Sequence, residues 1–283
     1  MTESDMRQLL KKKSEWKWPH IVADFHLPRI VSASLLIVVV LLSSVETSPV
    51  LAAEALHVYG PGGPLPAIKD AAAAYQRQTG VDVMVTGGPT AQWVGNAKAD
   101  ADMVFSGSEV MMSDFIKQLP DIDPKTVEPM YLRAAAILVR PGNPGRITGI
   151  SDLVKPGHRI LVVNGAGQQG LWEDVAGRLG DIETVRKFRG NIVQYADNSG
   201  EARQAWTNDH SIDAWLIWTI WQTANPSLAD QVQIEPQYAI YRDVGIAMTK
   251  RGESHGDAAG FVAFLRSDKG AVIFRKWGWQ VRQ

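Results

Sequence analysis

The chain has 283 residues, with 29 Lys and Arg against 30 Asp and Glu, and a formal net charge of −1. This balance gives no electrostatic reason to expect nucleic acid or an anionic membrane surface as a partner. Cysteine is absent, which excludes a disulfide framework, a thiol nucleophile and a cysteine metal site.

The first 53 residues have the order of a secretory leader. Lysines at 11–13 precede an apolar run over 30–45, and small residues follow at Ala52 and Ala53. Basic, apolar and small-residue regions in this order predict a signal peptide, cleaved after Ala52 or Ala53. The run is shorter than the roughly 20 residues of a membrane span, but an uncleaved anchor is the alternative. We therefore expect a periplasmic protein, attached to a membrane only if the leader is retained.

Residues 54–283 alternate strand-like and helix-like segments in two sets. The first set has strands at 56–60, 81–85, near 101–105 and at 131–140, with helices at 65–80 and 108–119. After the proline- and glycine-rich break at 141–147, the second set has helices from 151, at 171–179, 182–188 and 200–207, strands at 159–164, 191–196, 231–236 and 241–250, and an apolar segment at 213–221. Two amphipathic helices around 267–268 end the chain. Strands alternating with helices predict parallel sheets covered by helices, here an α/β protein of two lobes.

The loops that follow the expected strands share an uncharged, polar composition. They are rich in glycine, serine, threonine and asparagine, and lie at 61–64, 86–90, 105–108, 164–170 and 197–201. In open α/β sheets, ligands bind at the carboxyl ends of strands. Free N–H groups at helix starts favour a negatively charged ligand, and glycine lets it approach the backbone closely. These loops therefore predict one cleft for an oxyanion, a phosphate or a carboxylate.

One of these loops contains G-A-G-Q-Q-G at 165–170, which has the spacing of a dinucleotide-binding fingerprint. The motif lies in the middle of the chain, and no acidic residue follows at the expected offset of about 20 residues. We therefore interpret it as a helix-start turn or an anion-binding loop, and expect no cofactor. The histidines show no metal-ligand spacing, and Glu173-Asp174 fits the first turn of a helix, so we expect no metal and no catalytic residues.

Two residue types leave alternatives open. Trp93, Trp172, Trp218 and Trp221 lie near the loops, where an indole can be part of the core or form a wall of the pocket. Arg133 lies in an otherwise apolar strand, and a buried guanidinium without a partner is costly. It therefore meets an internal carboxylate such as Asp213 or faces an anion in the cleft; Arg242, in the return strand, poses the same choice.

Several stretches together resemble the AcfC/Paa accessory colonization factor group of periplasmic solute-binding proteins, which is similar to the molybdate and sulfate binders of ABC importers. These stretches are YGPGGP, GPTAQW, DMVFSGS, YLRAAAILVRPGNP, GLWEDVAGR, NIVQYADNSGEAR, DAWLIWTIW and FLRSDKGAVIFRKWGW, spread over 56–279. The resemblance implies a type 2 periplasmic-binding-protein fold, with two α/β lobes joined by crossover strands near 131–140 and 241–249 and a ligand cleft between them. One lobe would comprise 54–134 plus 241–283, and the other 135–240.

The resemblance also implies a set of ligand-binding residues. Carried onto this sequence, together with neighbouring side chains, the set is Gly62, Gly63, Thr90, Trp93, Ser106, Ser108, Arg133, Gly167, Gln168, Ser199, Trp218 and Tyr241. Trp218 stands where oxyanion binders of that class have a tyrosine, which exchanges a hydroxyl for an indole N–H. Arg133 occupies the YxR position of the group. The group is suited to small phosphorylated or polycarboxylate metabolites.

The function implied is the capture of a small organic anion or oxyanion by hinge closure, with an ABC-type permease as the delivery partner. The main alternative is an adhesin or colonization antigen without a transport role. The protein could also form a homodimer. An exported enzyme is the second alternative, but the loops offer hydroxyl and amide groups rather than a general base.

Overall fold

The computed structural model describes residues 54–165 and 167–281. The predicted signal peptide or anchor at 1–53 lies outside these residues. Within them, no helix has both the length and the apolar character that a membrane crossing requires.

Strands and helices alternate along the described chain. The strands are β1 (Leu56–Gly60), β2 (Val83–Gly87), β3 (Met103–Phe105), β4 (Glu128–Val139), β5 (Ile160–Val163), β6 (Ile192–Ala196), β7 (Ala214–Trp218), β8 (Asp230–Gln233) and β9 (Tyr241–Met248). The helices are α2 (Leu65–Thr79), α3 (Thr90–Asp100), α4 (Glu109–Gln118), α5 (Ile150–Leu153), α6 (Leu171–Ala176), α7 (Ile182–Asn191), α8 (Ser199–Asn208), α9 (Thr219–Ala224), α10 (Lys250–Ser254), α11 (Ala258–Arg266) and α12 (Asp268–Lys276), with 3₁₀ turns η1 (Pro124–Thr126) and η2 (Pro236–Tyr238).

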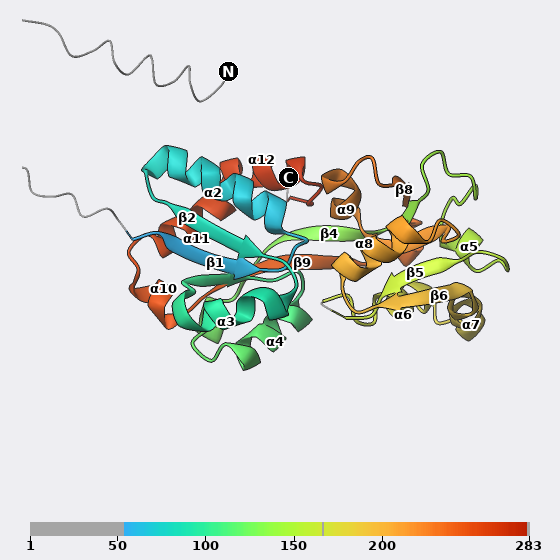
Figure 1. Ribbon diagram of the computed structural model, residues 1–283, viewed down its shortest axis with the longest axis horizontal. Coiled ribbons are helices and arrows are strands. Elements are labelled where there is room, and N and C mark those ends of the chain that lie inside the picture. Colours follow the sequence, from blue (N-terminus) through green and yellow to red (C-terminus); the bar gives the residue numbers. More distant parts are fainter. Residues whose placement is uncertain (1–53, 166, 282–283) are drawn as a thin grey trace, which may run out of the picture. The chain divides into compact units, whose positions relative to one another are not determined.

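The strands form two groups that share β4. The order is β2-β1-β3-β9-β4-β7-β5-β6, with β8 also paired to β4. Pairing within β1–β3 and within β5–β7 is parallel, whereas β9 and β4 pair antiparallel to their neighbours. Figure 1 shows β4 and β9 running between the two groups. The strands therefore form the two-lobe α/β architecture that the sequence predicts.

The partner of β4 changes within the strand. Ala134 pairs with Tyr241 of β9, and the next residue, Ala135, pairs with Trp218 of β7. We call the β1–β3 side, with β9 and the first half of β4, the first lobe, and the β5–β8 side, with the rest of β4, the second lobe. The division at 134/135 and 240/241 stays a prediction, because the whole described chain forms one compact unit.

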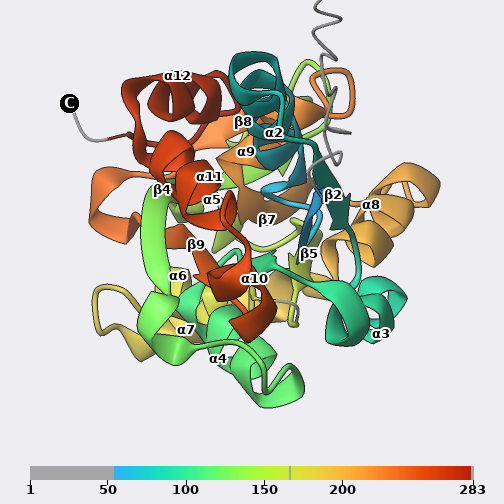
Figure 2. The same cartoon turned by 90° about the vertical axis from the view of Figure 1, so that its left-hand side faces the viewer.

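Helices α2, α11 and α12 pack together in the first lobe (Figure 2). The Tyr75 ring of α2 lies 5.3 Å from the Phe261 ring and 5.5 Å from the Phe264 ring, measured between centroids.

A separate apolar cluster joins α3 and α4, where Trp93 and Phe115 meet edge to face at 5.2 Å. Helix α3 has no counterpart in the sequence patterns above, since it buries only Trp93 and Ala97 and contains Gly95.

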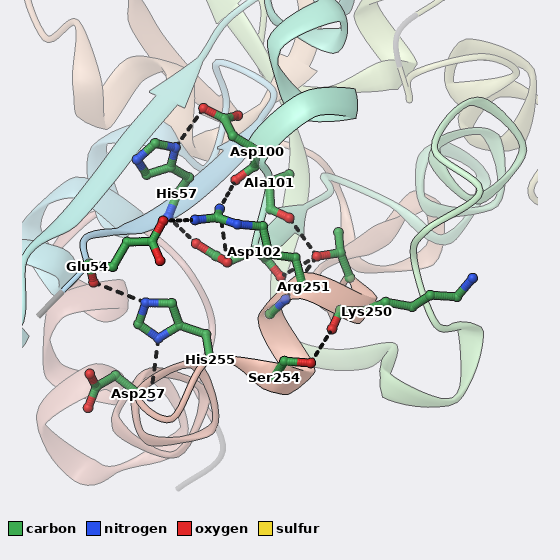
Figure 3. Close-up of polar contacts among 12 residues, drawn as sticks. Glu54, His57, Asp100, Ala101, Asp102, Lys250, Arg251, Ser254, His255 and Asp257 are labelled. Carbon is green, nitrogen blue, oxygen red and sulfur yellow. Dashed lines mark hydrogen bonds and ion pairs between the residues drawn. The ribbon is translucent and has the colours of Figure 1, made fainter.

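A polar network holds the start of β1 against α10, at the opposite end of the strand from the loop 61–64 (Figure 3). Arg251 pairs with the Glu54 carboxylate at 2.5 Å and with the fully buried Asp102 at 3.2 Å. His57 Nδ1 lies 2.8 Å from Asp100 Oδ2. Burial raises the pKa of Asp100, but hydrogen bonds from Tyr59 and His57 outweigh this effect and the net shift is downward. The network fixes the first described residues to the body of the first lobe.

Candidate ligand-binding site

A pocket lies where the loops of the two lobes meet. Its volume is about 130 Å³, which is below the roughly 300–1,000 Å³ of sites for drug-sized ligands. The lining residues are Pro61, Gly62, Gly63, Pro64, Gly88, Pro89, Thr90, Gly107, Met111, Arg133, Gln168, Asn198, Ser199, Gly200 and Trp221. Loops after β1, β2 and β3 supply the first-lobe side, and residues before α6 and at the start of α8 supply the other.

Four helices begin at the pocket. Helices α2 and α3 start after Pro64 and Pro89, which make no side-chain cap, and neither helix has an acidic residue in its first turn. Helices α4 and α8 are capped by Ser108 and Asn198, whose side chains accept from backbone N–H groups. The partial positive charge of a helix start attracts anions. At α2 and α3 no side-chain carboxylate of the first turn offsets this charge.

Arg133, from the middle of β4, is the only charged residue among the described ones that line the pocket. Its side chain is buried, with only 4% of the residue exposed. One terminal nitrogen donates a hydrogen bond to the Gly107 carbonyl, whereas Nε has no hydrogen-bond partner. A β-carbon added at Gly63 would lie 2.9 Å from Nη1, and one added at Gly107 would lie 2.7 Å from Nη2. The two glycines thus make room for the guanidinium.

The charge of Arg133 meets no carboxylate within 4.0 Å in the described part of the chain. Asp213, the internal partner considered above, instead accepts a hydrogen bond from the backbone N–H of Arg159 at 2.9 Å. Burial lowers the pKa of Arg133 to about 9, an effect that Asp243 partly offsets. The guanidinium therefore stays protonated at neutral pH.

Half of the twelve residues expected from the sequence line this pocket, namely Gly62, Gly63, Thr90, Arg133, Gln168 and Ser199. Gln168 and Ser199 come from different loops of the second lobe and are joined by a hydrogen bond of 2.6 Å from Nε2 to Oγ. Gln168 is only 3% exposed. The structure thus brings donor groups from both lobes to one place.

Both expected tryptophans pack behind the pocket rather than on its surface. Trp93 is buried, donates from Nε1 to the Gly88 carbonyl at 3.2 Å, and stacks on Tyr59. It therefore supports the loop at Gly88, which does line the pocket. Trp218 is fully buried, its ring lies 4.4 Å from the Arg133 guanidinium carbon, and its N–H has no acceptor.

The other four expected residues also lie outside the lining. Ser106 and Ser108 are buried, and the Ser108 hydroxyl accepts from the Met111 N–H at 3.2 Å as the cap of α4. Gly167 has φ +79°, and a β-carbon there would lie 2.9 Å from Met111 Cε. It packs the second-lobe loop against α4. Tyr241 begins β9 and is 43% exposed.

The sequence left Trp221 open as part of the core or a wall of the pocket, and the structure places it in the lining. Sequence reasoning did not assign a ligand-binding role to Met111 or Asn198, which also line the pocket. Asn198 carries a detectable signal, because an asparagine three residues before a glutamate is typical of a helix start. Trp221 follows Trp218 by three residues, and the chain turns from β7 into α9 between them. Nothing local in the sequence distinguishes Met111 from Met112, the other methionine of α4, which is part of the core.

A family model described as bacterial extracellular solute-binding protein matches residues 56–280. The chain belongs to this family. No curated protein matched the sequence.

Solved structures of PEB3 from Campylobacter jejuni are similar to this solute-binding protein over 80% of its chain and 100% of theirs. The PEB3 structure is 37% identical in sequence, with a TM-score of 0.75. A structure of PEB3 bound to L-phospholactate is 38% identical, with a TM-score of 0.76. These matches confirm the resemblance to the accessory colonization factor group.

Two more distant structures share the fold. The sulfate-binding protein SubI from Mycobacterium tuberculosis has a TM-score of 0.66 at 17% identity, covering 80% of this chain and 86% of its own. The periplasmic molybdate-binding protein of Azotobacter vinelandii has a TM-score of 0.61 at 20% identity, covering 81% and 100%. At these identities the likeness confirms the two-lobe fold alone.

Proposed function

We propose that this solute-binding protein captures a small organic anion that carries a phosphate or carboxylate group. The observation that supports this most strongly is the buried Arg133 guanidinium, which lines the pocket without a carboxylate partner among the described residues. Burying an unpaired charge is costly, so an anionic ligand supplies the missing compensation. The uncapped starts of α2 and α3 add N–H donors on the same side.

L-phospholactate, bound by the 38% identical PEB3, carries both a phosphate and a carboxylate and is the natural first probe. In our proposal one anionic group of such a ligand faces Arg133 and the first-lobe helix starts. The other end meets Ser199 and the start of α8 in the second lobe. A ligand that contacts both lobes favours the closed state by those extra contacts.

Capture followed by delivery to an ABC-type permease, in the periplasm or at the outer face of the inner membrane, completes the proposal. Arg133 is the only titratable side chain among the described pocket residues. Acid–base catalysis needs a second group with a suitable pKa, so this composition favours binding over turnover.

Isothermal titration calorimetry with L-phospholactate tests the proposal. The comparison ligands are L-lactate, inorganic phosphate, sulfate and molybdate. We expect L-phospholactate to bind more tightly than L-lactate or inorganic phosphate, because neither of those reaches both sides of the pocket with two anionic groups. Absence of binding for all five ligands to folded protein would contradict the proposed ligand class.

A further inference from the structure

The Arg133 guanidinium lies over two indole rings that come from distant parts of the chain. Its central carbon is 4.4 Å from the Trp218 ring centroid and 5.5 Å from the Trp279 ring centroid. Trp218 ends β7, whereas Trp279 lies in the short segment after α12. Both distances are within the roughly 6 Å over which an aromatic face attracts a cation.

The backbone fixes Trp279 next to Arg133. Leu132, the residue before Arg133, exchanges two hydrogen bonds with Gln280, the residue after Trp279, at 3.2 and 2.7 Å. The Trp279 ring also meets Phe274 at 6.0 Å, and only 2% of the residue is exposed. The C-terminal segment therefore holds this ring in a defined place relative to the guanidinium.

Hydrogen bonding does not explain a tryptophan at this position. The Trp279 indole N–H is buried and has no acceptor, and burying such a donor costs free energy. Trp277, two residues earlier, differs in this respect, because its indole N–H donates to Asp70 Oδ2 at 2.9 Å. The contact between Trp279 and Arg133 is instead made by the face of the indole ring.

An aromatic face stabilises a buried cation without neutralising it. A carboxylate in the same place would form an ion pair with Arg133 and compete with an incoming anion. The indole faces carry no negative charge that would form an ion pair with Arg133, so a ligand can pair with the guanidinium. Stabilisation by the rings and attraction of the ligand are thus compatible.

We propose that Trp279 is a positioning residue for anion binding, which holds the Arg133 guanidinium at the pocket through the face of its ring. The inference rests on the proposed function, since it requires an anion at Arg133. Trp279 itself does not line the pocket.

The test compares Trp279→Phe with Trp279→Leu, using calorimetry with L-phospholactate and thermal unfolding of each variant. Phenylalanine keeps an aromatic face, and leucine keeps only apolar bulk. A desolvated cation–π contact is a strong one, so we expect Trp279→Leu to weaken binding by at least about tenfold. Trp279→Phe should recover most of the affinity even if both variants lose similar stability.

Trp277→Leu is the matched control, because it removes a tryptophan two residues away whose ring lies over Lys276 instead. It should bind L-phospholactate as the unmodified protein does. If Trp279→Leu does not fold, Trp279→Met takes its place as a flexible aliphatic variant. Equal affinity of Trp279→Phe and the folded aliphatic variant would overturn the inference. A failure of the unmodified protein to bind any of the five ligands would instead count against the proposed function.

Discussion

Arg133 and Arg242 lie directly opposite each other in the antiparallel pairing of β4 with β9. Residues opposite each other in such a pair share a face of the sheet, and like charges there destabilise it. The two arginine side chains have different surroundings. Arg242 forms an ion pair with Asp174 of α6, whereas the Arg133 guanidinium lies over two tryptophan rings and lines the pocket. One cation is thus paired with a carboxylate of the protein, and the other has no carboxylate within 4.0 Å among the described residues, which is why we propose a ligand for it.

Replacing Arg133 should therefore remove most of the ligand affinity. A charge-assisted hydrogen bond is worth about 1.5–3 kcal/mol, so Arg133→Gln should weaken L-phospholactate binding by about tenfold to more than a hundredfold in calorimetry. Arg133→Lys keeps the charge but not the planar fork. Its affinity should therefore lie between those of the unmodified protein and Arg133→Gln. Unchanged affinity in a folded Arg133→Gln variant would exclude this residue from the site.

Gly107 should be required for the position of the guanidinium. A β-carbon at Gly107 would lie 2.7 Å from Arg133 Nη2, at the far end of a flexible side chain that can move. Gly107→Ala should therefore displace the guanidinium and weaken binding by about tenfold, the scale of one charge-assisted hydrogen bond, with little loss of thermal stability.

Gly190→Ala is the control for this substitution. Gly190 lies in α7, outside the pocket lining, and an added β-carbon would meet no atom within 4 Å. Its affinity should stay near that of the unmodified protein. Unchanged affinity in the Gly107→Ala variant as well would remove the argument for a specific space around Arg133.

The Asp174–Arg242 pair should contribute modestly to stability. Its side chains are 45% and 32% exposed, and exposed ion pairs contribute about 0–1 kcal/mol and weaken as salt rises. Asp174→Asn should lower the free energy of unfolding by less than about 1 kcal/mol in urea titrations at low salt, with a smaller difference in 0.5 M NaCl. A larger loss of unfolding free energy that salt does not reduce would contradict the description of this pair as an exposed, screened ion pair.

Asp152 should make stability depend on pH in the acid range. Lys155 Nζ donates to Oδ1 at 2.6 Å, and the Thr148 hydroxyl and N–H donate to Oδ2 at 2.6 and 2.7 Å. The Lys155 hydrogen bond and then those from Thr148 lower the pKa of Asp152 far below its usual value. Since the folded pKa is below the unfolded value of about 3.9, the stabilisation is present above about pH 4 and is lost as the pH falls further.

Thermal unfolding of Asp152→Asn from pH 7 to pH 2 checks this prediction. The variant should unfold at a lower temperature than the unmodified protein at pH 7, by a difference of about 1 kcal/mol in stability, and the difference should shrink toward pH 2. Asp114→Asn removes an exposed pair with Lys117 and should change little at either pH. A constant difference for Asp152→Asn across the range would contradict the assigned hydrogen bonds.

The sequence predicts the local elements better than the neighbours of each side chain. Strand–helix alternation and the uncharged loops indicate two α/β lobes and a polar cleft, and these loops do line the pocket. Periodicity does not indicate whether a side chain lies in the core or in the pocket once the chain changes direction. Trp218 ends β7 and points into the core, whereas Trp221 on the following helix reaches the pocket.

Contacts between distant parts of the chain leave no local pattern at all. Trp279 reaches Arg133 only because the C-terminal segment pairs with β4 through Leu132 and Gln280. The choice between an internal partner and a ligand for Arg133 likewise depends on where Asp213 lies, and Asp213 holds the Arg159 backbone instead.

A crystal structure of the protein with L-phospholactate tests the central claim most directly. Our account predicts that one anionic group of the ligand lies within hydrogen-bonding distance of the Arg133 guanidinium, against the starts of α2 and α3. Ligand density at another place on the protein, with the Arg133 guanidinium paired to a carboxylate of the chain, would contradict it.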